Sequence, residues 1–246
     1  MFGFEARNGA GSVLISASKR HLTYKERGQL VVSNSVIDRP STNTFTFSSP
    51  VTTSEPPTVF MRVNESRHAS VSMYVALVGS PGNWTGVKVI VAASGGSVAP
   101  RYVFDIVIGH FKSSEGVVSD FGMVVYGESG EQVFSDKDRL IAYSKFTKKW
   151  TVSVTGGYPN YAYYNLAPDI IIEDDDYVDV SSLNRGGIFQ YLDGTMYTSV
   201  NLRQGGVNTL RLTTQCNLQY ATTTSVAYSN LRFCMAVCKF PLSRYP

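Results

Sequence analysis

The sequence is poor in cysteine, histidine and charge, and each shortage excludes a class of protein. Its three cysteines are an odd number near the end of the chain, which does not fit a disulfide framework. Cys234 and Cys238 are four residues apart, too far to bridge along one strand, so we interpret both as small buried hydrophobic residues. The histidines, His21, His68 and His110, have no companion at metal-ligand spacing, so we predict no metal site.

Segments that direct a chain out of the cell, into a membrane or onto nucleic acid are also missing. Residues 1–5 lack the basic and apolar regions of a secretory signal, and no apolar run approaches membrane-spanning length. The formal net charge is +3, with Lys and Arg scattered rather than clustered, unlike a nucleic-acid-binding protein. The densest basic cluster, Lys145–Trp150, is explained by a solvated strand edge, where lysines discourage aggregation. We therefore expect a protein made in a reducing cytoplasm, with no membrane span and no nucleic-acid partner.

Motifs that would support catalysis or a cofactor are absent from the sequence. It contains no phosphate-binding glycine loop, nucleophile elbow or zinc-protease helix, and no Ser, His and Asp are placed so that a triad can be argued. The acidic run Glu173–Asp176 would need to converge to hold calcium. Adjacent carboxylates on an extended chain point to opposite faces, so we interpret the run as a solvated loop between two strands. We expect a protein that is not an enzyme and has no cofactor.

What the sequence does have is the composition and rhythm of β-strands. Aromatic residues make up 12% of the chain, which favours strands. Short apolar runs alternate with turn signals, and no stretch of helical length holds a clean helical period. The clearest runs span residues 59–63, 71–78, 87–91, 102–108, 150–154, 177–180 and 196–200. This pattern is typical of an all-β sandwich or barrel.

An internal repeat accompanies the strand pattern. Shifting the chain by 119 positions, from Phe2 to Phe121, aligns residues 2–25 with residues 121–144. The second segment predicts a β-hairpin closed by the turn Gly127–Gly130 and followed by the polar turn Asp136–Asp138. The identical pairs are Phe2/Phe121, Gly3/Gly122, Gly11/Gly130, Ser16/Ser135, Arg20/Arg139 and Tyr24/Tyr143. Six identities are more than unrelated segments of this length share, so we interpret the match as a duplication. A repeat is informative because it fixes the architecture.

The repeat and the chain length together predict two domains. A chain of 246 residues suits two domains of common size. We place the boundary in the polar segment His110–Gly116. The prediction is an all-β protein with two tandem β-sandwich-like domains, residues 1–116 and 117–246, related by internal duplication. Removal of the second domain should then leave a protein that still folds but no longer assembles.

Each predicted domain has a structural hairpin with an aromatic-glycine pair, and an arginine at the equivalent position of the repeat. The aromatic-glycine pairs are Phe2 with Gly3 and Phe121 with Gly122. We expect these hairpins to pack the core of each domain. We expect Arg20 and Arg139 to pair with backbone carbonyls or with acidic side chains at the turn.

A group of tyrosines around Pro159 is the strongest candidate for a binding surface. Its members are Tyr158, Tyr161, Tyr163 and Tyr164. Tyrosine offers a large contact area at a small entropy cost, together with a hydroxyl group for a partner. A loop of this composition would stack on sugar rings or seal a subunit interface. The alternative, equally weighted, is that half of these tyrosines belong to the local core.

The second copy of the repeat carries an aromatic-Gly-x-x-Val hairpin, a glycine-containing turn, a hydrophobic strand and an Asp-Arg-Leu sequence. The residues of this pattern are Phe121, Gly122, Val125, Gly130, Val133, Phe134, Asp138, Arg139 and Leu140. In this pattern the segment Phe121–Tyr143 resembles a family of small virion proteins of long-tailed bacteriophages, often encoded among tail genes. The N-terminal copy departs from it, with Lys19 and His21 in place of Asp138 and Leu140.

The resemblance implies a non-enzymatic structural component of a phage tail tip or baseplate. Such a protein is assembled in the host cytoplasm and then resides in the virion tail. Its partners would be other phage tail proteins and further copies of itself, in a multiple of three because of tail symmetry. The alternative is a receptor- or carbohydrate-binding tail fibre or tip module whose ligand is a bacterial surface glycan. A cell-wall hydrolase is the least favoured hypothesis, because it would need paired carboxylates.

Overall fold

In the computed structural model, most of the described residues lie in β-strands. The described residues are 5–7, 9, 13–16, 20–33, 41–66, 71–92, 101–111, 123–130, 132–147, 150–155, 161–166, 173, 175–183, 189–191, 194–202, 211–216 and 234–246. A single helical turn, α1 (Val180–Leu183), interrupts the strands of this described part. No helix among the described residues is long and apolar enough to cross a membrane. The predicted all-β class is therefore confirmed.

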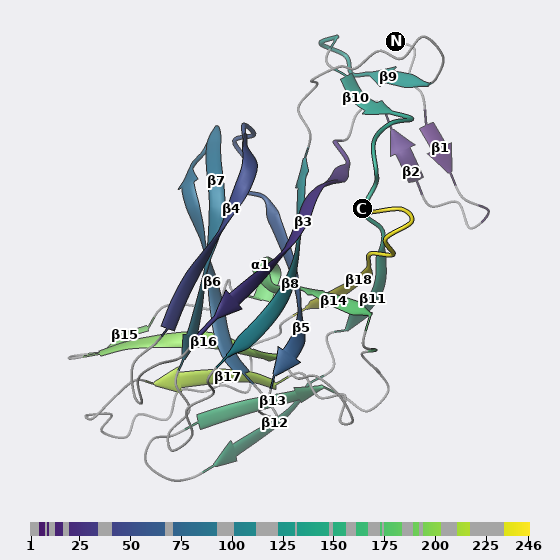
Figure 1. The fold of residues 1–246 in the computed structure, drawn as a ribbon. Coiled ribbons are helices and arrows are strands. Elements are labelled where there is room, and N and C mark those ends of the chain that lie inside the picture. The colour runs from purple at the N-terminus through teal and green to yellow at the C-terminus, as the bar shows by residue number, and fades with distance from the viewer. Residues whose placement is uncertain are drawn as a thin grey trace.

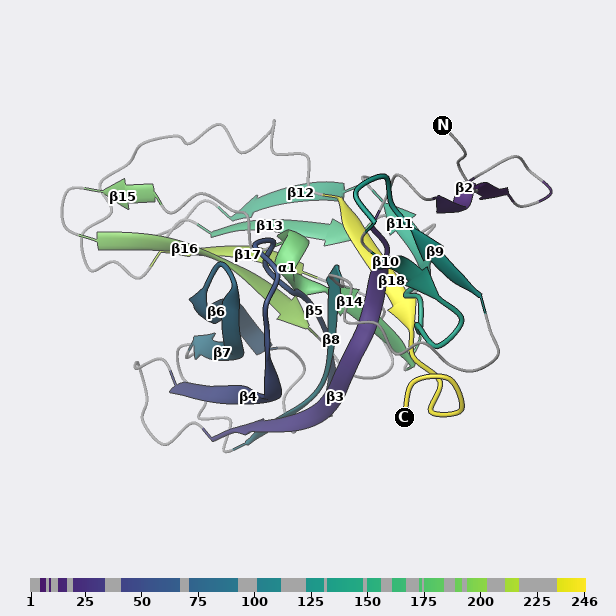
Figure 2. The ribbon, with the colours of Figure 1, turned by 90° about the horizontal axis from the view of Figure 1, so that it is seen from above.

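Two large sheets make up the body of the molecule. The six-stranded sheet has the order β11 (Tyr143–Thr147), β18 (Met235–Lys239), β14 (Asp176–Asp179), β5 (Thr58–Ser66), β8 (Tyr102–Phe111) and β3 (Leu22–Val32). The eight-stranded sheet has the order β12 (Trp150–Thr155), β13 (Tyr161–Leu166), β17 (Arg211–Cys216), β16 (Gly194–Leu202), β6 (Val71–Ser80), β7 (Asn83–Ala92) and β4 (Ser41–Val51), and β15 (Phe189–Tyr191) adds to β16. Figure 2 shows the two groups of strands curving past each other.

The main core lies between these sheets. Alternate residues of β8, which include Phe104, Ile106 and Ile108, are completely buried in it. Val87 and Val89 of β7 meet the same core from the eight-stranded sheet. Each aliphatic side chain buried in this way contributes about 1.5–3 kcal/mol to folding. The period-two apolar pattern of the sequence therefore produces a β-sandwich-like body.

A second apolar cluster covers the outer face of the six-stranded sheet. It contains Phe60, Val107, Ile141, Tyr177, Cys238, Phe240 and Tyr245. β8 is buried on both faces because Val107 points into this cluster while Ile106 and Ile108 point into the main core. Cys238 is buried as expected, whereas Cys234 is exposed, so the interpretation of Cys234 as a buried residue was wrong.

Strands from both sides of the expected domain boundary share both sheets. β14 pairs with β5 through Val178 and Met61, and β16 pairs with β6 through Val200 and Met73. The main core also combines residues from both halves, because Val178, Val180, Met235 and Val237 pack with the apolar residues of β5 and β8. The division at residue 116 does not separate the sheets, and the two-domain duplication is not confirmed.

Two small hairpins stand apart from the body, at one end of the molecule (Figure 1). The first joins β1 (Glu5–Arg7) to β2 (Val13–Ser16), and the second joins β9 (Val124–Tyr126) to β10 (Gln132–Ser135). Under the 119-residue shift these four strands have identical bounds.

The strand pairing of the two hairpins is also equivalent. Glu5 pairs with Ser16 in the first hairpin, and the equivalent Val124 pairs with Ser135 in the second. Both ladders have a register shift at the same place. Counted from the pair of Glu5 with Ser16, or of Val124 with Ser135, it lies between the second and third pairs of residues. The predicted turn of the second hairpin is confirmed, because Gly130 has a φ of 81° and its amide donates to the Gly127 carbonyl at 3.1 Å. The sequence repeat is thus a repeat of local structure.

The two copies of the repeat meet where β3 crosses the chain after β10. The Ile141 amide donates to the Leu22 carbonyl at 2.9 Å, and the Tyr24 amide donates to the Arg139 carbonyl at 2.8 Å. Leu22 and Ile141 are equivalent under the 119-residue shift, so the copies cross antiparallel at matching positions. The crossing passes close to Gly109 of β8, where a Cβ would lie 2.6 Å from Ile141 Cδ1.

Candidate functional site

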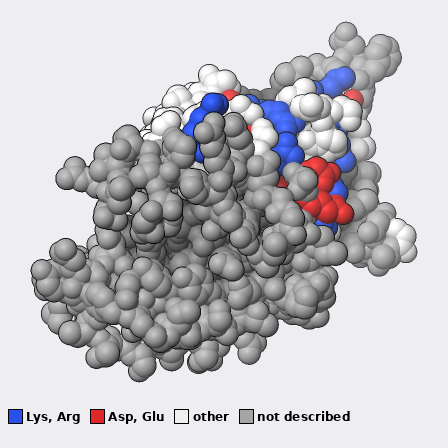
Figure 3. Space-filling view, turned by 60° about the horizontal axis from the view of Figure 1, so that its bottom comes forward, with Lys and Arg blue, Asp and Glu red and all other residues white. Residues whose placement is uncertain are grey.

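A cluster of charged side chains lies where β14 begins, beside β18 and β11. It comprises three carboxylates and two lysines: Glu173, Asp175, Asp176, Lys145 and Lys239. Figure 3 shows acidic side chains gathered in one patch on the surface, with basic side chains beside it. We refer to these five residues as the acid–lysine cluster.

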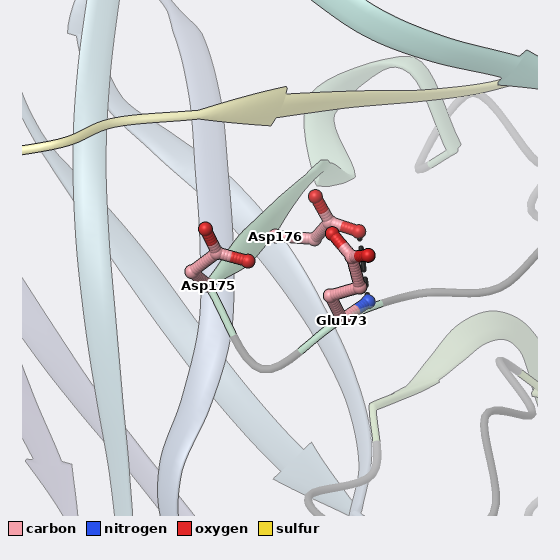
Figure 4. Close-up of side chains that lie close together, drawn as sticks. All are labelled: Glu173, Asp175 and Asp176. Atoms are coloured by element: carbon pink, nitrogen blue, oxygen red, sulfur yellow. Dashed lines mark hydrogen bonds between the residues drawn. The ribbon is translucent and has the colours of Figure 1, made fainter.

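The backbone turns before β14 and brings the three carboxylates together. The Asp176 amide donates to the Glu173 carbonyl at 3.0 Å, and the Glu173 amide donates to Asp176 Oδ2 at 2.8 Å. One oxygen from each of Glu173, Asp175 and Asp176 lies within 4.8 Å of the others. Figure 4 shows the Glu173 and Asp176 carboxylates side by side, with Asp175 set apart from them. The expectation that these carboxylates could not converge was wrong, because it assumed an extended chain where the chain turns.

Two lysines from neighbouring strands lie among the carboxylates. Lys145 Nζ of β11 is 2.6 Å from Asp176 Oδ2 and 3.5 Å from Glu173 Oε2. Lys239 of β18, which pairs with Asp176 in the ladder, forms ion pairs with Glu173 and with Asp175, the latter at 3.1 Å. β11 is an edge strand of its sheet, as predicted, but the Lys145 side chain is 27% exposed and lies in the cluster rather than in solvent.

The pKa values in the cluster show that its charges stabilise one another. The hydrogen bond from Lys239 is the main cause that lowers the pKa of Glu173 and the pKa of Asp175. In return, hydrogen bonds to Glu173 and Asp175 raise the pKa of Lys239. A general acid needs a carboxyl group with a raised pKa, so Glu173 and Asp175 have the opposite tuning.

The cluster therefore has the chemistry of an interstrand ion-pair network. Asp176 has a fully buried side chain, and its Oδ1 has no hydrogen-bond partner among the described residues. Its Oδ2 accepts from Lys145, so a cation bound at that oxygen would have to displace an ammonium group. The arrangement ties β11, β14 and β18 together at one end of the six-stranded sheet.

A pair of exposed aromatic rings lies close to this cluster on β11. Tyr143 and Phe146 have ring centroids 5.0 Å apart, and Phe146 is 59% exposed. Burial of part of Tyr143, followed by the nearby Asp179 carboxylate, raises the pKa of its hydroxyl. Sequence reasoning identified Tyr143 through the repeat alone and missed Phe146, whose alternation with Lys145 on an edge strand was the available signal.

Three of the four predicted binding tyrosines lie in a strand rather than in a loop. Tyr161, Tyr163 and Tyr164 lie in β13, whose neighbours are β12 and β17. Tyr163, for example, pairs with Ser153 on one side and with Thr213 on the other. The loop assignment was therefore wrong for these three residues, and Tyr158 lies outside the described residues. Their role in binding stays a prediction.

The predicted hairpin residues are divided between described and undescribed parts of the chain. Phe2, Gly3, Phe121 and Gly122 lie outside the described residues. Arg20 forms a half-exposed ion pair with Glu55 at 3.2 Å. Arg139 lies over the ring of Tyr24, with its guanidinium carbon 5.9 Å from the ring centre. The two equivalent arginines thus have different partners.

A buried polar network on the outer face of the six-stranded sheet was missed by sequence reasoning. Asp105 of β8 is 8% exposed and accepts hydrogen bonds from Arg62 Nε at 2.8 Å, Gln29 at 3.1 Å and Asn64 at 3.0 Å. The guanidinium of Arg62 also stacks on the ring of Tyr177 at 4.8 Å. Arg62 and Asn64 alternate with apolar residues along β5, which was the signal for a polar stripe on that face.

Comparisons with known proteins identify no relative. A scan against protein-family models found no match, and searches of curated proteins and of solved structures also found none.

Proposed function

We propose that this protein is a non-enzymatic structural component of a bacteriophage tail tip or baseplate. The observation that carries the proposal is the β9–β10 hairpin, which stands outside both large sheets (Figure 1). It exposes two large apolar side chains, Met123 at 39% and Tyr126 at 52%. Exposed apolar residues on a projecting element are suited to contacts with neighbouring subunits. The resemblance of Phe121–Tyr143 to phage virion proteins supports a tail as the assembly.

In this proposal the partners are other tail proteins and further copies of the same chain. A closed ring in a multiple of three would match the symmetry of a tail. The protein would be assembled in the host cytoplasm and reside in the virion. The acid–lysine cluster would contribute to the stability of the subunit rather than to a reaction.

The test compares the mass of the assembled species in variants of the hairpin. The double variant Met123→Ser with Tyr126→Ser removes the exposed apolar contacts, and we expect it to shift the protein from an oligomer to a monomer in light scattering coupled to gel filtration. The matched control is Phe146→Ser, which removes an exposed aromatic side chain (59% exposed) from β11 of the six-stranded sheet. A monomeric wild type, or an oligomer unchanged in the double variant, would count against the hairpin as an assembly element.

A second candidate function, binding to a bacterial surface glycan, is supported by the exposed ring pair of Tyr143 and Phe146. Aromatic rings on an accessible strand provide a stacking surface for sugars. Binding of the wild type on a glycan array, lost in Phe146→Ala, would favour this function. An array without any bound glycan would dispose of it.

We also propose that residues 2–25 and 121–144 arose by tandem duplication. The support is the matching bounds and register of the two hairpins, including the equivalent register shift. A chimera in which residues 5–16 are replaced by residues 124–135 should then fold with the same hairpin pairing. Loss of that pairing in the chimera would argue that the two hairpins are similar by chance.

A further inference from the structure

Residues 240–246 cross the outer face of the six-stranded sheet. The amides of Arg244 and Tyr245 donate to the Pro241 carbonyl at 3.0 Å and 2.9 Å, which closes a tight turn. The turn returns Tyr245 to the sheet, where it is 2% exposed. Its ring packs against Phe240 at 5.1 Å and Tyr24 at 5.4 Å between ring centroids. Tyr245 thus occupies a formed site on the sheet.

This segment is tied to β3 by side chains of that strand. Arg27 donates to the Tyr245 carbonyl at 2.8 Å and to the Phe240 carbonyl at 3.4 Å, while its other nitrogen donates to the Tyr177 hydroxyl at 2.9 Å. The Tyr24 hydroxyl donates to the Pro246 carbonyl. Hydrogen bonds at both ends of the segment therefore fix it to β3.

The same segment is tied to the base of the β9–β10 hairpin through Leu140. The Tyr245 hydroxyl donates to the Leu140 carbonyl at 2.6 Å, and Arg244 donates to the same oxygen at 3.4 Å. The Leu140 side chain packs on the apolar cluster of the hairpin, which consists of Val125, Val133 and Phe134. Leu140 therefore connects two parts of the molecule. Its side chain packs on the hairpin, and its carbonyl accepts hydrogen bonds from residues 240–246.

The direct connection between the hairpin base and β3 is short. Among the described residues its backbone part is the single bridge between Thr23 and Leu140, flanked by the hydrogen bonds of the Tyr24 and Ile141 amides. Two ring contacts, of Arg139 with Tyr24 and of His21 with Phe134, add to it. A ladder of this length is marginal without further support. Ile141 and Tyr245 belong to the same outer cluster, so the crossing shares its apolar contacts with residues 240–246.

We propose that residues 240–246 act as a strap that fixes the β9–β10 hairpin against β3, with Tyr245 as its latch. When Tyr245 leaves its site, the hairpin is released while the two-sheet body stays folded. The inference does not depend on the proposed function, since it rests on the contacts of Tyr245, Arg27 and Leu140. It implies that the orientation of the hairpin is controlled by a segment distant in sequence.

Amide hydrogen exchange followed by NMR in the full chain tests the strap. Tyr245→Phe keeps the ring and removes the hydrogen bond to Leu140. We expect the Tyr24 and Ile141 amides to exchange about five-fold faster, the effect of losing one buried hydrogen bond. The amides of β5 and β8 should keep their wild-type rates. Arg27→Met, which removes the bonds to the Tyr245 and Phe240 carbonyls, should give the same local pattern.

The matched control is Tyr102→Phe, which makes the same chemical change at a buried tyrosine in the main core. It should not accelerate the Tyr24 and Ile141 amides selectively. Unchanged rates at these two amides in both Tyr245→Phe and Arg27→Met would overturn the proposal. An equal acceleration across β5 and β8 would also overturn it, because residues 240–246 would then be an ordinary part of the body.

Discussion

At the scale of single residues, Asp105 shows how a buried charge is accommodated in this fold. Donors from β3 and β5 surround its carboxylate, and Arg62 contacts it through both Nε and Nη2 at 2.8 Å. The exposed pair of Arg20 and Glu55 offers a natural comparison, because both of its side chains are nearly half exposed. Buried and exposed pairs are expected to differ in their contribution to stability because water screens the exposed pair.

We expect Asp105→Asn to destabilise the protein by about 1–3 kcal/mol, because it leaves Arg62 without its anionic partner and turns an amide NH2 group toward other donors. The control Glu55→Gln should change the free energy of unfolding by less than about 1 kcal/mol. Urea unfolding of both variants measures the difference. Equal losses in the two variants would contradict the structural role assigned to Asp105.

At the scale of elements, the acid–lysine cluster links three strands and makes their association depend on pH. The pKa values of Glu173 and Asp175 lie below their ordinary values of 4.5 and 3.8 in the folded protein. A carboxyl group with a lowered folded pKa stabilises the fold above its unfolded pKa, and this contribution is lost as the pH falls through the folded pKa. The raised pKa of Lys239 gives the opposite pH dependence: its contribution to stability is fully present below its ordinary value of 10.5 and is lost as the pH rises through the raised folded value.

Lys239→Met should therefore destabilise the protein at pH 6, and the difference from the wild type should shrink as the pH falls below about 4. The physical reason is that protonated Glu173 and Asp175 no longer attract the ammonium group. Lys137→Met serves as the control, because Lys137 is 59% exposed and its ion pair with Asp136 is 4.0 Å long. Chemical unfolding between pH 6 and pH 3 provides the measurement. A destabilisation that stays constant across this range would show that the lysine acts through packing alone.

The elements that sequence predicted best are those with strong local patterns. The runs 71–78 and 102–108 are strands because their apolar and β-branched residues suit a buried ladder, and β8 is buried on both faces. The turn at Asp136–Lys137 was also predicted, and Asp138 closes it by accepting from the Ser135 amide at 2.8 Å. In these cases the chemistry of neighbouring residues decides the structure.

Features set by distant partners were not predictable in this way. Cys234 precedes β18 and is exposed, whereas Cys238 lies in β18 and is buried in the outer cluster, a difference that depends on distant strands. Tyr161–Tyr164 was assigned to a loop because tyrosines around a proline suit both loops and strands, and pairing with β17 decides between them. The acid–lysine cluster required a turn before β14 and lysines from two other strands. Local patterns do not specify these long-range pairings.

At the scale of the whole molecule, the two halves of the sequence build one sandwich together. β5 would lose β14 as its neighbour, and β6 would lose β16, if the chain were divided at residue 116. The main core would lose Val178, Val180, Met235 and Val237 at the same time. The equivalent hairpins show that the repeat shaped local structure, while the sheets combine strands from both halves.

The most direct test is the folding of residues 1–116 expressed alone. The shared sheets predict that this fragment lacks a cooperative urea transition, because the edges of β5 and β6 are open and the core is incomplete. Addition of residues 117–246 should restore the transition of the full chain. A fragment of residues 1–116 that unfolds cooperatively on its own, with the dispersed NMR spectrum of a folded domain, would contradict the account.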